Sequence, residues 1–294
     1  MNKKVKYGIT FTAGLGLAAL LRSSWERKSF VNGNYVIRDY KIASQFTLVF
    51  LSDLHSAVYG DNNAALIQAV LDKKPDAVII GGDMMVTKPG KKPDFSALTA
   101  LLEGLKGLPV YYCEGNHEQR MKLYPDKYKG WWKKLKAIID YYGVPYLLDD
   151  SVMLRDDILL SGLYIDKEYY TKLIKRKMPD SYVTKHIPQL NDKSDLRFRI
   201  LAAHAPQYME SYWKGGADLV LSGHFHGGVM VLPYLGPVIS PQFNVFPRYA
   251  RGIYTDKRFK KYGIVSAGLG THSINIRLFN RPELITVNLL PEEE

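Results

Sequence analysis

The chain has 294 residues, of which 46% are hydrophobic and 23% are charged. This composition is typical of a globular protein and excludes a disordered or fibrous chain. The single cysteine, Cys113, excludes an internal disulfide framework and a cysteine-based metal cluster. A mean hydropathy of −0.18 excludes a polytopic membrane protein.

The first thirty residues differ from the rest of the chain. An uncharged run from Ile9 to Leu21 is preceded by lysines and followed by Arg22, Arg27 and Lys28. The run has the length of a signal-peptide core but is shorter than the roughly 20 residues that cross a bilayer as a helix. No small-residue cleavage site follows it, so residues 1–30 are interpreted as a membrane anchor or signal-like segment, with an uncleaved anchor favoured. A helix that packs on the main domain is the alternative, and cations on both sides leave the side of the membrane open.

The formal net charge of +11 is concentrated at the N-terminus. Residues 1–30 hold six cations and one anion, which leaves +6 for the rest of the chain. This excess is too mild to indicate a nucleic-acid-binding surface. A basic segment of the body is either a solvated face or a rim that attracts phosphate or an anionic membrane; it contains Lys172, Lys175, Arg176 and Lys177.

After the N-terminal segment, short apolar runs alternate with helical segments. Apolar runs of four to six residues between turn residues are typical of fully buried strands. We expect strands at 47–51, 77–80, 110–113, 158–161, 198–202 and 219–222, and helices at 64–71 and 95–105. The tail, with 264–266 and 284–290, is expected to be all-β. The pattern predicts an α/β domain over residues 45–290 and no second domain.

Polar side chains with metal-binding groups follow the predicted strands. Ligands of open α/β sheets bind outside the carboxyl ends of the strands, so these side chains should converge in one cleft. A single histidine at a strand end is most often structural, whereas eight metal-capable side chains at strand ends are hard to obtain by chance. The set is Asp53, His55, Asp83, Asn116, His117, His204, His224 and His226.

The donor types indicate a class of metal. Carboxylate, amide and imidazole donors without thiolate suit Mn, Fe or Zn, and they offer too much nitrogen for a calcium site. Asp83 follows two glycines, whose missing side chains let the backbone approach closely. Two divalent ions about 4 Å apart would activate a water and stabilise an in-line phosphoryl displacement.

Five sequence blocks resemble the calcineurin-like metallophosphoesterase superfamily over about residues 45–290. The blocks are Asp53-x-His55, Gly82-Asp83, Gly115-Asn116-His117-Glu118, Ala203-His204-Ala205-Pro206 and Gly223-His224-x-His226. The resemblance implies a four-layer α-β-β-α sandwich of two mixed β-sheets flanked by helices. It also implies that a phosphodiester or pyrophosphate bond is hydrolysed by metal-activated hydroxide.

The same resemblance implies roles for the individual residues. Asp83 would bridge the two ions, His117 would protonate the leaving oxygen or stabilise phosphoryl charge without binding a metal, and Glu118 would orient imidazoles. One ion would take Asp53, His55, Asp83 and His226, and the other would take Asp83, Asn116, His204 and His224.

The C-terminal part resembles a bacterial subgroup of small phosphodiesterases, often with an N-terminal signal or anchor, that includes a UDP-2,3-diacylglucosamine pyrophosphatase. The resemblance lies in His226-Gly227-Gly228, Phe246-Pro247, 268–270 and 276–283, where Arg277 would hold the C-terminal strands or contact phosphate. It implies a phosphorylated small molecule or a lipid-linked, cell-envelope substrate, with a membrane surface as partner. Val229 and His272 depart from the subgroup's pattern and leave the choice of substrate open.

Other functions stay open at this stage. A nuclease or nucleotide phosphodiesterase could use the same metal centre, although the modest charge of the body argues against nucleic acid. A non-catalytic interaction module would have lost metal-binding residues, whereas every ligand position is filled here. The aromatic residues that follow His117 could line an apolar groove or simply pack a helix; they are Tyr124, Tyr128, Trp131 and Trp132.

Overall fold

The computed structural model describes residues 3–171, 176–228, 230–232, 235–239, 246–271 and 275–293. Four residues named above lie outside these ranges: Lys172, Lys175, Val229 and His272.

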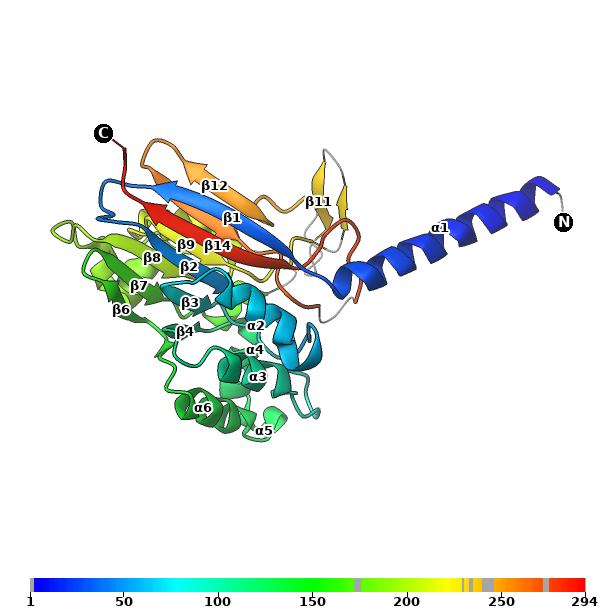
Figure 1. Ribbon diagram of the computed structural model, residues 1–294, viewed down its shortest axis with the longest axis horizontal. Coiled ribbons are helices and arrows are strands. Elements are labelled where there is room, and N and C mark those ends of the chain that lie inside the picture. The colour runs from blue at the N-terminus through cyan, green and yellow to red at the C-terminus, as the bar shows by residue number, and fades with distance from the viewer. Residues whose placement is uncertain are drawn as a thin grey trace.

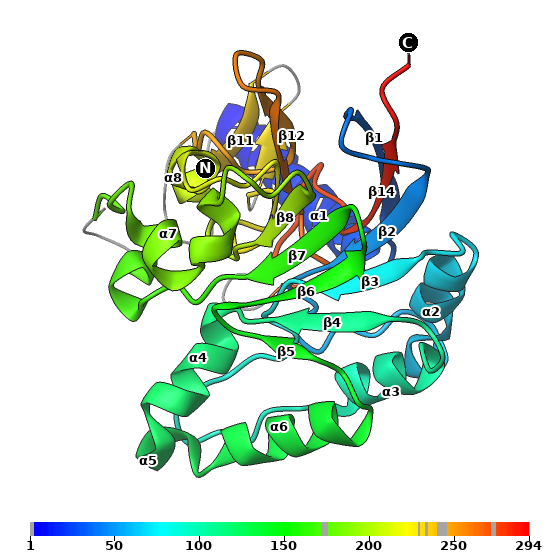
Figure 2. The same ribbon diagram turned by 90° about the vertical axis from the view of Figure 1, so that its left-hand side faces the viewer.

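Two six-stranded mixed sheets face each other (Figures 1 and 2). The first sheet has the order β1 (Val31–Arg38), β14 (Glu283–Leu290), β2 (Phe46–Leu51), β3 (Ala77–Ile80), β4 (Val110–Cys113) and β5 (Tyr146–Leu147). The second has the order β12 (Gly252–Asp256), β13 (Lys261–Val265), β9 (Leu219–Ser222), β8 (Phe198–Ala202), β7 (Ile158–Gly162) and β6 (Asp150–Arg155). A separate hairpin is formed by β10 (Met230–Leu232) and β11 (Gly236–Ile239).

Helices cover the outer face of each sheet. Over the first sheet lie α2 (Ala64–Leu71), α3 (Ser96–Gly104) and α6 (Trp131–Tyr141), which share a buried cluster with β2, β3 and β4. Over the second lie α7 (Tyr182–His186) and α8 (Met209–Lys214), which share another cluster with β8 and β9. A third cluster fills the space between the sheets. The predicted four-layer α-β-β-α sandwich is therefore confirmed.

Strand β2 shows how the sequence builds these layers. Because side chains alternate along a strand, Val49 and Leu51 pack toward the helices, while Leu48 and Phe50 pack against the second sheet. All four side chains are fully buried. This explains the continuous apolar run that predicted a buried strand.

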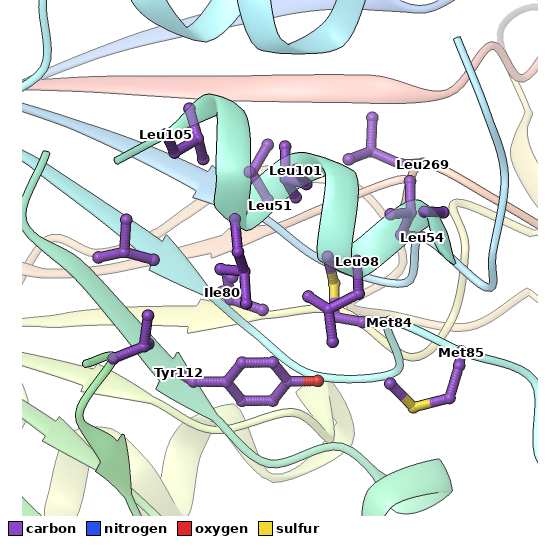
Figure 3. Close-up of a cluster of buried hydrophobic side chains, with 14 of the residues drawn as sticks. Leu51, Leu54, Ile80, Met84, Met85, Leu98, Leu101, Leu105, Tyr112 and Leu269 are labelled. Atoms are coloured by element: carbon purple, nitrogen blue, oxygen red, sulfur yellow. The ribbon is translucent and has the colours of Figure 1, made fainter. Parts of the chain in front are cut away.

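The central strands run parallel, which gathers their carboxyl ends at one edge. In the first sheet β2, β3, β4 and β5 pair in parallel, and in the second β7, β8, β9 and β13 do so. The loops at this edge are held by a hydrophobic cluster that includes Leu54, Met84 and Leu269 (Figure 3). Leu54 lies between Asp53 and His55, and Met84 directly follows Asp83, so their packing fixes two of the ligand-bearing loops.

Two of the elements that were not predicted show why the sequence pattern missed them. Strand β1 contains Gly33 and Asn34 and pairs with β14 at the sheet edge, with every second residue exposed, so it lacks a continuous apolar run. Helix α4 (Asn116–Leu123) is strongly polar and lacks a helical apolar period, and the short α5 (Pro125–Tyr128) follows it. Tyr128 is buried, and the other three aromatic residues of this region pack against the core. Of the two expected roles, this favours packing of a helix and not the lining of an apolar groove.

The N-terminal segment forms one long helix, α1 (Lys3–Arg27), which extends away from the sandwich (Figure 1). Its described leucines Leu17, Leu20 and Leu21 are about 60% exposed, whereas Ser23 and Glu26 in its last turns are buried. Within the described part of the chain, none of the helices combines the length and apolarity that a bilayer crossing requires.

Candidate metal centre

The eight expected site residues converge at the carboxyl ends of the central strands. Asp53 and His55 follow β2, Asp83 follows β3, and Asn116 and His117 open α4 after β4. From the second sheet, His204 follows β8, while His224 and His226 follow β9. None of the eight exposes more than 6% of its surface. The site therefore lies where the edges of both sheets meet.

The donor atoms form two overlapping groups. In the first, His226 Nε2 lies 3.3 Å from Asp53 Oδ1 and 3.2 Å from His55 Nε2. In the second, His204 Nε2 lies 3.2 Å from Asp83 Oδ2, and His224 contributes a nitrogen within 4.8 Å of both. Asp83 Oδ2 is also 3.9 Å from His55 Nε2, so this carboxylate lies between the groups.

Asn116 belongs to the second group. In the orientation that satisfies its hydrogen bonds, the amide nitrogen donates to His224 Nδ1 at 2.8 Å and the amide oxygen accepts from Arg120 Nη2 at 2.6 Å. A half-turn of the amide would bring its oxygen to His224 Nδ1, where an amide oxygen and an imidazole nitrogen can both bind one cation.

Backbone carbonyls fix the protonation of two histidines. His204 Nδ1 lies 2.7 Å from the Gly81 carbonyl, and His226 Nδ1 lies 3.0 Å from the Gly270 carbonyl. A carbonyl only accepts, so each Nδ1 donates, and in the neutral ring Nε2 then carries the lone pair. Metal-binding histidines are held by the same type of hydrogen bond.

This arrangement fits a pair of cations. The lone pair on Nε2 of each neutral ring faces a carboxylate oxygen at 3.2–3.3 Å, and two buried acceptors repel unless a proton or a metal ion lies between them. Burial alone would lower the pKa of His204, but the carboxylates of Asp83 and Asp53 raise it to about 10. The field at this position therefore favours positive charge, and the oxygen and nitrogen donors suit divalent Mn, Fe or Zn.

The backbone at the site is strained. Five of the seven expected metal ligands have positive φ angles although none is glycine: Asp53, His55, Asp83, His224 and His226. Each such residue costs about 1–3 kcal/mol, which persists only where the surrounding structure enforces it. Strain at so many donors is consistent with a site shaped for ligand geometry at the expense of stability.

Gly82 lets the loops after β3 and β4 touch. Its φ is +85°, and an added Cβ would collide with the backbone of Gly115. We expect Gly82→Ala to lower the free energy of unfolding by more than about 2 kcal/mol. Gly107→Ala is the matched control, because Gly107 has φ +90° but open space around it, and should cost only about 1–2 kcal/mol. Equal losses in urea unfolding would contradict the close approach.

Glu118 holds the Asp83 loop rather than an imidazole, which corrects the expected role. Its Oε2 accepts hydrogen bonds from the backbone N–H groups of Asp83 and Gly115 at 2.9 and 3.1 Å. Its Oε1 accepts from the Met84 N–H and from the Tyr112 hydroxyl. Burial and the nearby Asp83 carboxylate raise the pKa of Glu118 to about 7.

His117 is oriented by Thr87, a residue that no sequence motif singled out. The Thr87 backbone N–H donates to His117 Nδ1 at 2.8 Å. In the neutral ring the proton is therefore on Nε2, so this nitrogen cannot bind a metal but can donate a hydrogen bond to a phosphoryl oxygen. A nitrogen of His117 lies within 4.8 Å of the donor atoms of His55 and Asp83, which is compatible with action on a phosphoryl group held there.

His117→Asn should keep both ions and slow the hydrolysis of esters with good and poor leaving groups alike. We expect a loss of about 100-fold for both an alkyl ester and a nitrophenyl ester, because the lost hydrogen bond stabilises phosphoryl charge and not the leaving oxygen. Thr87→Val is the control, because it retains the backbone N–H that sets the tautomer. A loss confined to the alkyl ester would contradict this role and would indicate proton donation instead.

The loop before β14 supports His226 from the other side. The Asn280 side-chain amide donates to the His226 carbonyl at 2.7 Å. Arg277 is buried and donates to the carbonyls of Gly268 and Gly270. Of its two expected roles, these contacts support holding the C-terminal segment and not contacting phosphate. Both residues are tied to α1, because Glu26 accepts from the Asn280 N–H and Ser23 Oγ accepts from the Arg277 N–H.

Comparison with known proteins agrees with the site. A model of the calcineurin-like phosphoesterase family matches residues 46–228. YpbG, an uncharacterized protein of Bacillus subtilis (strain 168), is 24% identical, with 97% of each chain covered. YkuE, an uncharacterized metallophosphoesterase of the same strain, is 26% identical over 83% of this chain and 79% of its own. YaeI, a phosphodiesterase of Escherichia coli (strain K12), is 24% identical over 84% and 83%. The chain therefore belongs to the calcineurin-like phosphoesterase family of dimetal-dependent phosphoester hydrolases.

Proposed function

We propose that this enzyme hydrolyses a phosphodiester or pyrophosphate bond. The observation that carries the proposal is the buried set of seven donors around Asp83, with His117 beside them. Two divalent ions, when bound, would supply an activated water and neutralise phosphoryl charge. Asp83 would hold both ions, and the Nε2–H of His117 would donate a hydrogen bond to a phosphoryl oxygen and stabilise the charge that develops there.

The test is a substrate screen with the purified chain after metal reconstitution. Phosphorus NMR in ¹⁸O-labelled water would follow bis(p-nitrophenyl) phosphate, p-nitrophenyl phosphate and UDP-glucose. We expect metal-dependent incorporation of one ¹⁸O into the product of the diester or of the pyrophosphate. Turnover restricted to the monoester would reject the proposed bond class, although it would leave the metal chemistry intact.

We further propose that α1 attaches the enzyme to a membrane and that the substrate is lipid-linked or part of the cell envelope. Exposed Leu17, Leu20 and Leu21 give α1 an apolar surface, and Arg22 follows them. The last turn of α1 is two hydrogen bonds away from His226, through Glu26 and Asn280. A membrane that holds α1 would thus lie close to the site.

Deletion of residues 1–20 should abolish binding to phospholipid vesicles and leave hydrolysis of a soluble diester nearly unchanged. The deletion removes the exposed leucines Leu17 and Leu20 but retains Ser23 and Glu26, which contact the loop near the site. Vesicle flotation of the full chain and of the deletion variant measures this directly. If the full chain stays unbound at low ionic strength, the membrane attachment is wrong.

A further inference from the structure

A pocket of about 620 Å³ adjoins the metal centre. It lies between α4, α5 and the short helix η2 (Lys167–Tyr170). Its lining includes Asn116, an expected metal ligand, and Tyr170, whose ring centroid lies 5.2 Å from that of His224. A substrate whose phosphorus is held at the metal centre can therefore extend into this pocket.

The described lining of the pocket is strongly cationic. It contains four cations, which are Arg120, Lys127, Lys167 and Arg176, and one carboxylate, Glu168. Arg176 Nη1 is paired with this carboxylate at 3.0 Å. Among its described lining residues, the other three cations (Arg120, Lys127 and Lys167) therefore have no carboxylate within the pocket to balance their charge.

Two of these cations converge on one aromatic ring. The ammonium groups of Lys127 and Lys167 lie 5.1 and 5.6 Å from the centroid of Tyr124, and Lys167 also donates to its hydroxyl at 3.5 Å. Arg120 continues the positive charge inward, because its Nη2 lies 2.6 Å from the Asn116 amide. Like charges held together repel, and an anion between them would relieve the repulsion.

A second pocket of about 490 Å³, whose lining shares Thr171 and Arg176 with the first, differs in its charge. Three of its four cations are in ion pairs: Arg176 with Glu168, Lys214 with Asp180 and Arg248 with Glu210. Of these two pockets, judged by their described lining residues, the first combines an expected metal ligand with an excess of positive charge and the second does not.

We propose that the first pocket binds a second phosphoryl group of the substrate, next to the one that is cleaved, with Lys127 and Lys167 as specificity-determining residues. The inference rests on the proposed function and narrows its substrate class to organic pyrophosphates. A simple diester carries one negative charge, which the metal ions neutralise, and needs no further cations. A pyrophosphate diester carries a second charge, which Arg120 and the two lysines would receive.

The test compares two non-hydrolysable probes on the metal-saturated full chain at fixed free-metal concentration. Methylphosphonate has one phosphoryl group and methylenebisphosphonate has two. The quantity measured is the ratio of their inhibition constants against bis(p-nitrophenyl) phosphate. The variant is Lys127→Ala/Lys167→Ala, and Lys133→Ala/Lys257→Ala is the control with the same change of net charge outside the pocket.

In the wild type we expect the bisphosphonate to inhibit more strongly than methylphosphonate. This preference, the inhibition constant of methylphosphonate divided by that of the bisphosphonate, should fall about tenfold in the pocket variant and stay unchanged in the control. The preference should also shrink as salt is added. An unchanged ratio in the pocket variant, or an equal fall in the control, would overturn the proposal. Calorimetric titration of both probes gives the same comparison without turnover, so the result does not depend on the proposed catalytic activity.

Discussion

Asp83→Asn is expected to reduce the metal content from two ions per chain to one or none. Diester hydrolysis should fall by more than about 100-fold, because removal of residues that only support a metal ligand already costs up to about 100-fold. Asp83 Oδ2 lies between the two donor groups, 3.2 Å from His204 Nε2 and 3.9 Å from His55 Nε2. An amide in its place carries no charge. With its oxygen kept on the His117 N–H, it would turn its NH₂ group toward His204.

The fold should survive this substitution, so that the loss can be assigned to the site. Asp83 Oδ1 accepts from the His117 backbone N–H at 2.7 Å, and an amide oxygen can replace it there. Metal content is measured by atomic spectroscopy and the fold by circular dichroism. Asp126→Asn, in an exposed position of α5, is the control and should retain both ions. A variant that holds two ions with wild-type affinity would show that Asp83 does not bridge them.

Glu26→Ala is expected to destabilise the chain by about 3 kcal/mol and to weaken metal binding, although Glu26 lies in α1, far from the site in sequence. Its buried carboxylate accepts from the backbone N–H groups of Phe279 and Asn280, each at 3.1 Å. Each buried N–H that loses its acceptor costs about 1–3 kcal/mol. Asn280 would then hold the His226 carbonyl less firmly.

The same contacts determine where the N-terminus can be cut. A deletion of residues 1–28 removes the charged anchor but also Ser23 and Glu26, and we expect it to lose diester hydrolysis and metal affinity. The deletion of residues 1–20 should keep both. Glu26→Gln retains one acceptor oxygen and should fall between wild type and Glu26→Ala in thermal unfolding and in calorimetric metal affinity. If both deletions retain the same metal affinity, α1 does not support the site.

The sequence could predict the parts of this fold that depend on local pattern. Buried parallel strands such as β3 and β9 are short apolar runs that are followed by glycine and then by a polar residue, and this pattern also located Asp83 and His224. The edge strand β1 was missed because it is extended only through its pairing with β14, which lies more than 240 residues away in sequence. Local pattern carries no information about such a partner.

The same distinction separates the predicted from the missed site residues. The expected donors follow strands and therefore share a sequence signature. Thr87 donates its own backbone N–H to the His117 side chain, while Asn280 and Glu26 bind backbone atoms of residues that are distant in sequence, so no spacing reveals these three residues. Arg120 had a weak signal, since it lies one helical turn after Asn116 on α4 and so on the same face.

The most direct test of the central claim is a metal titration of the metal-stripped full chain, followed by calorimetry and by hydrolysis of bis(p-nitrophenyl) phosphate in parallel. The claim is that Asp83 joins two donor groups into one dinuclear centre that cleaves phosphodiesters. We predict that two divalent ions bind per chain, that hydrolysis appears only as the second ion binds, and that chelation abolishes it. Hydrolysis by the stripped chain, or full activity with one ion bound, would contradict the dinuclear centre.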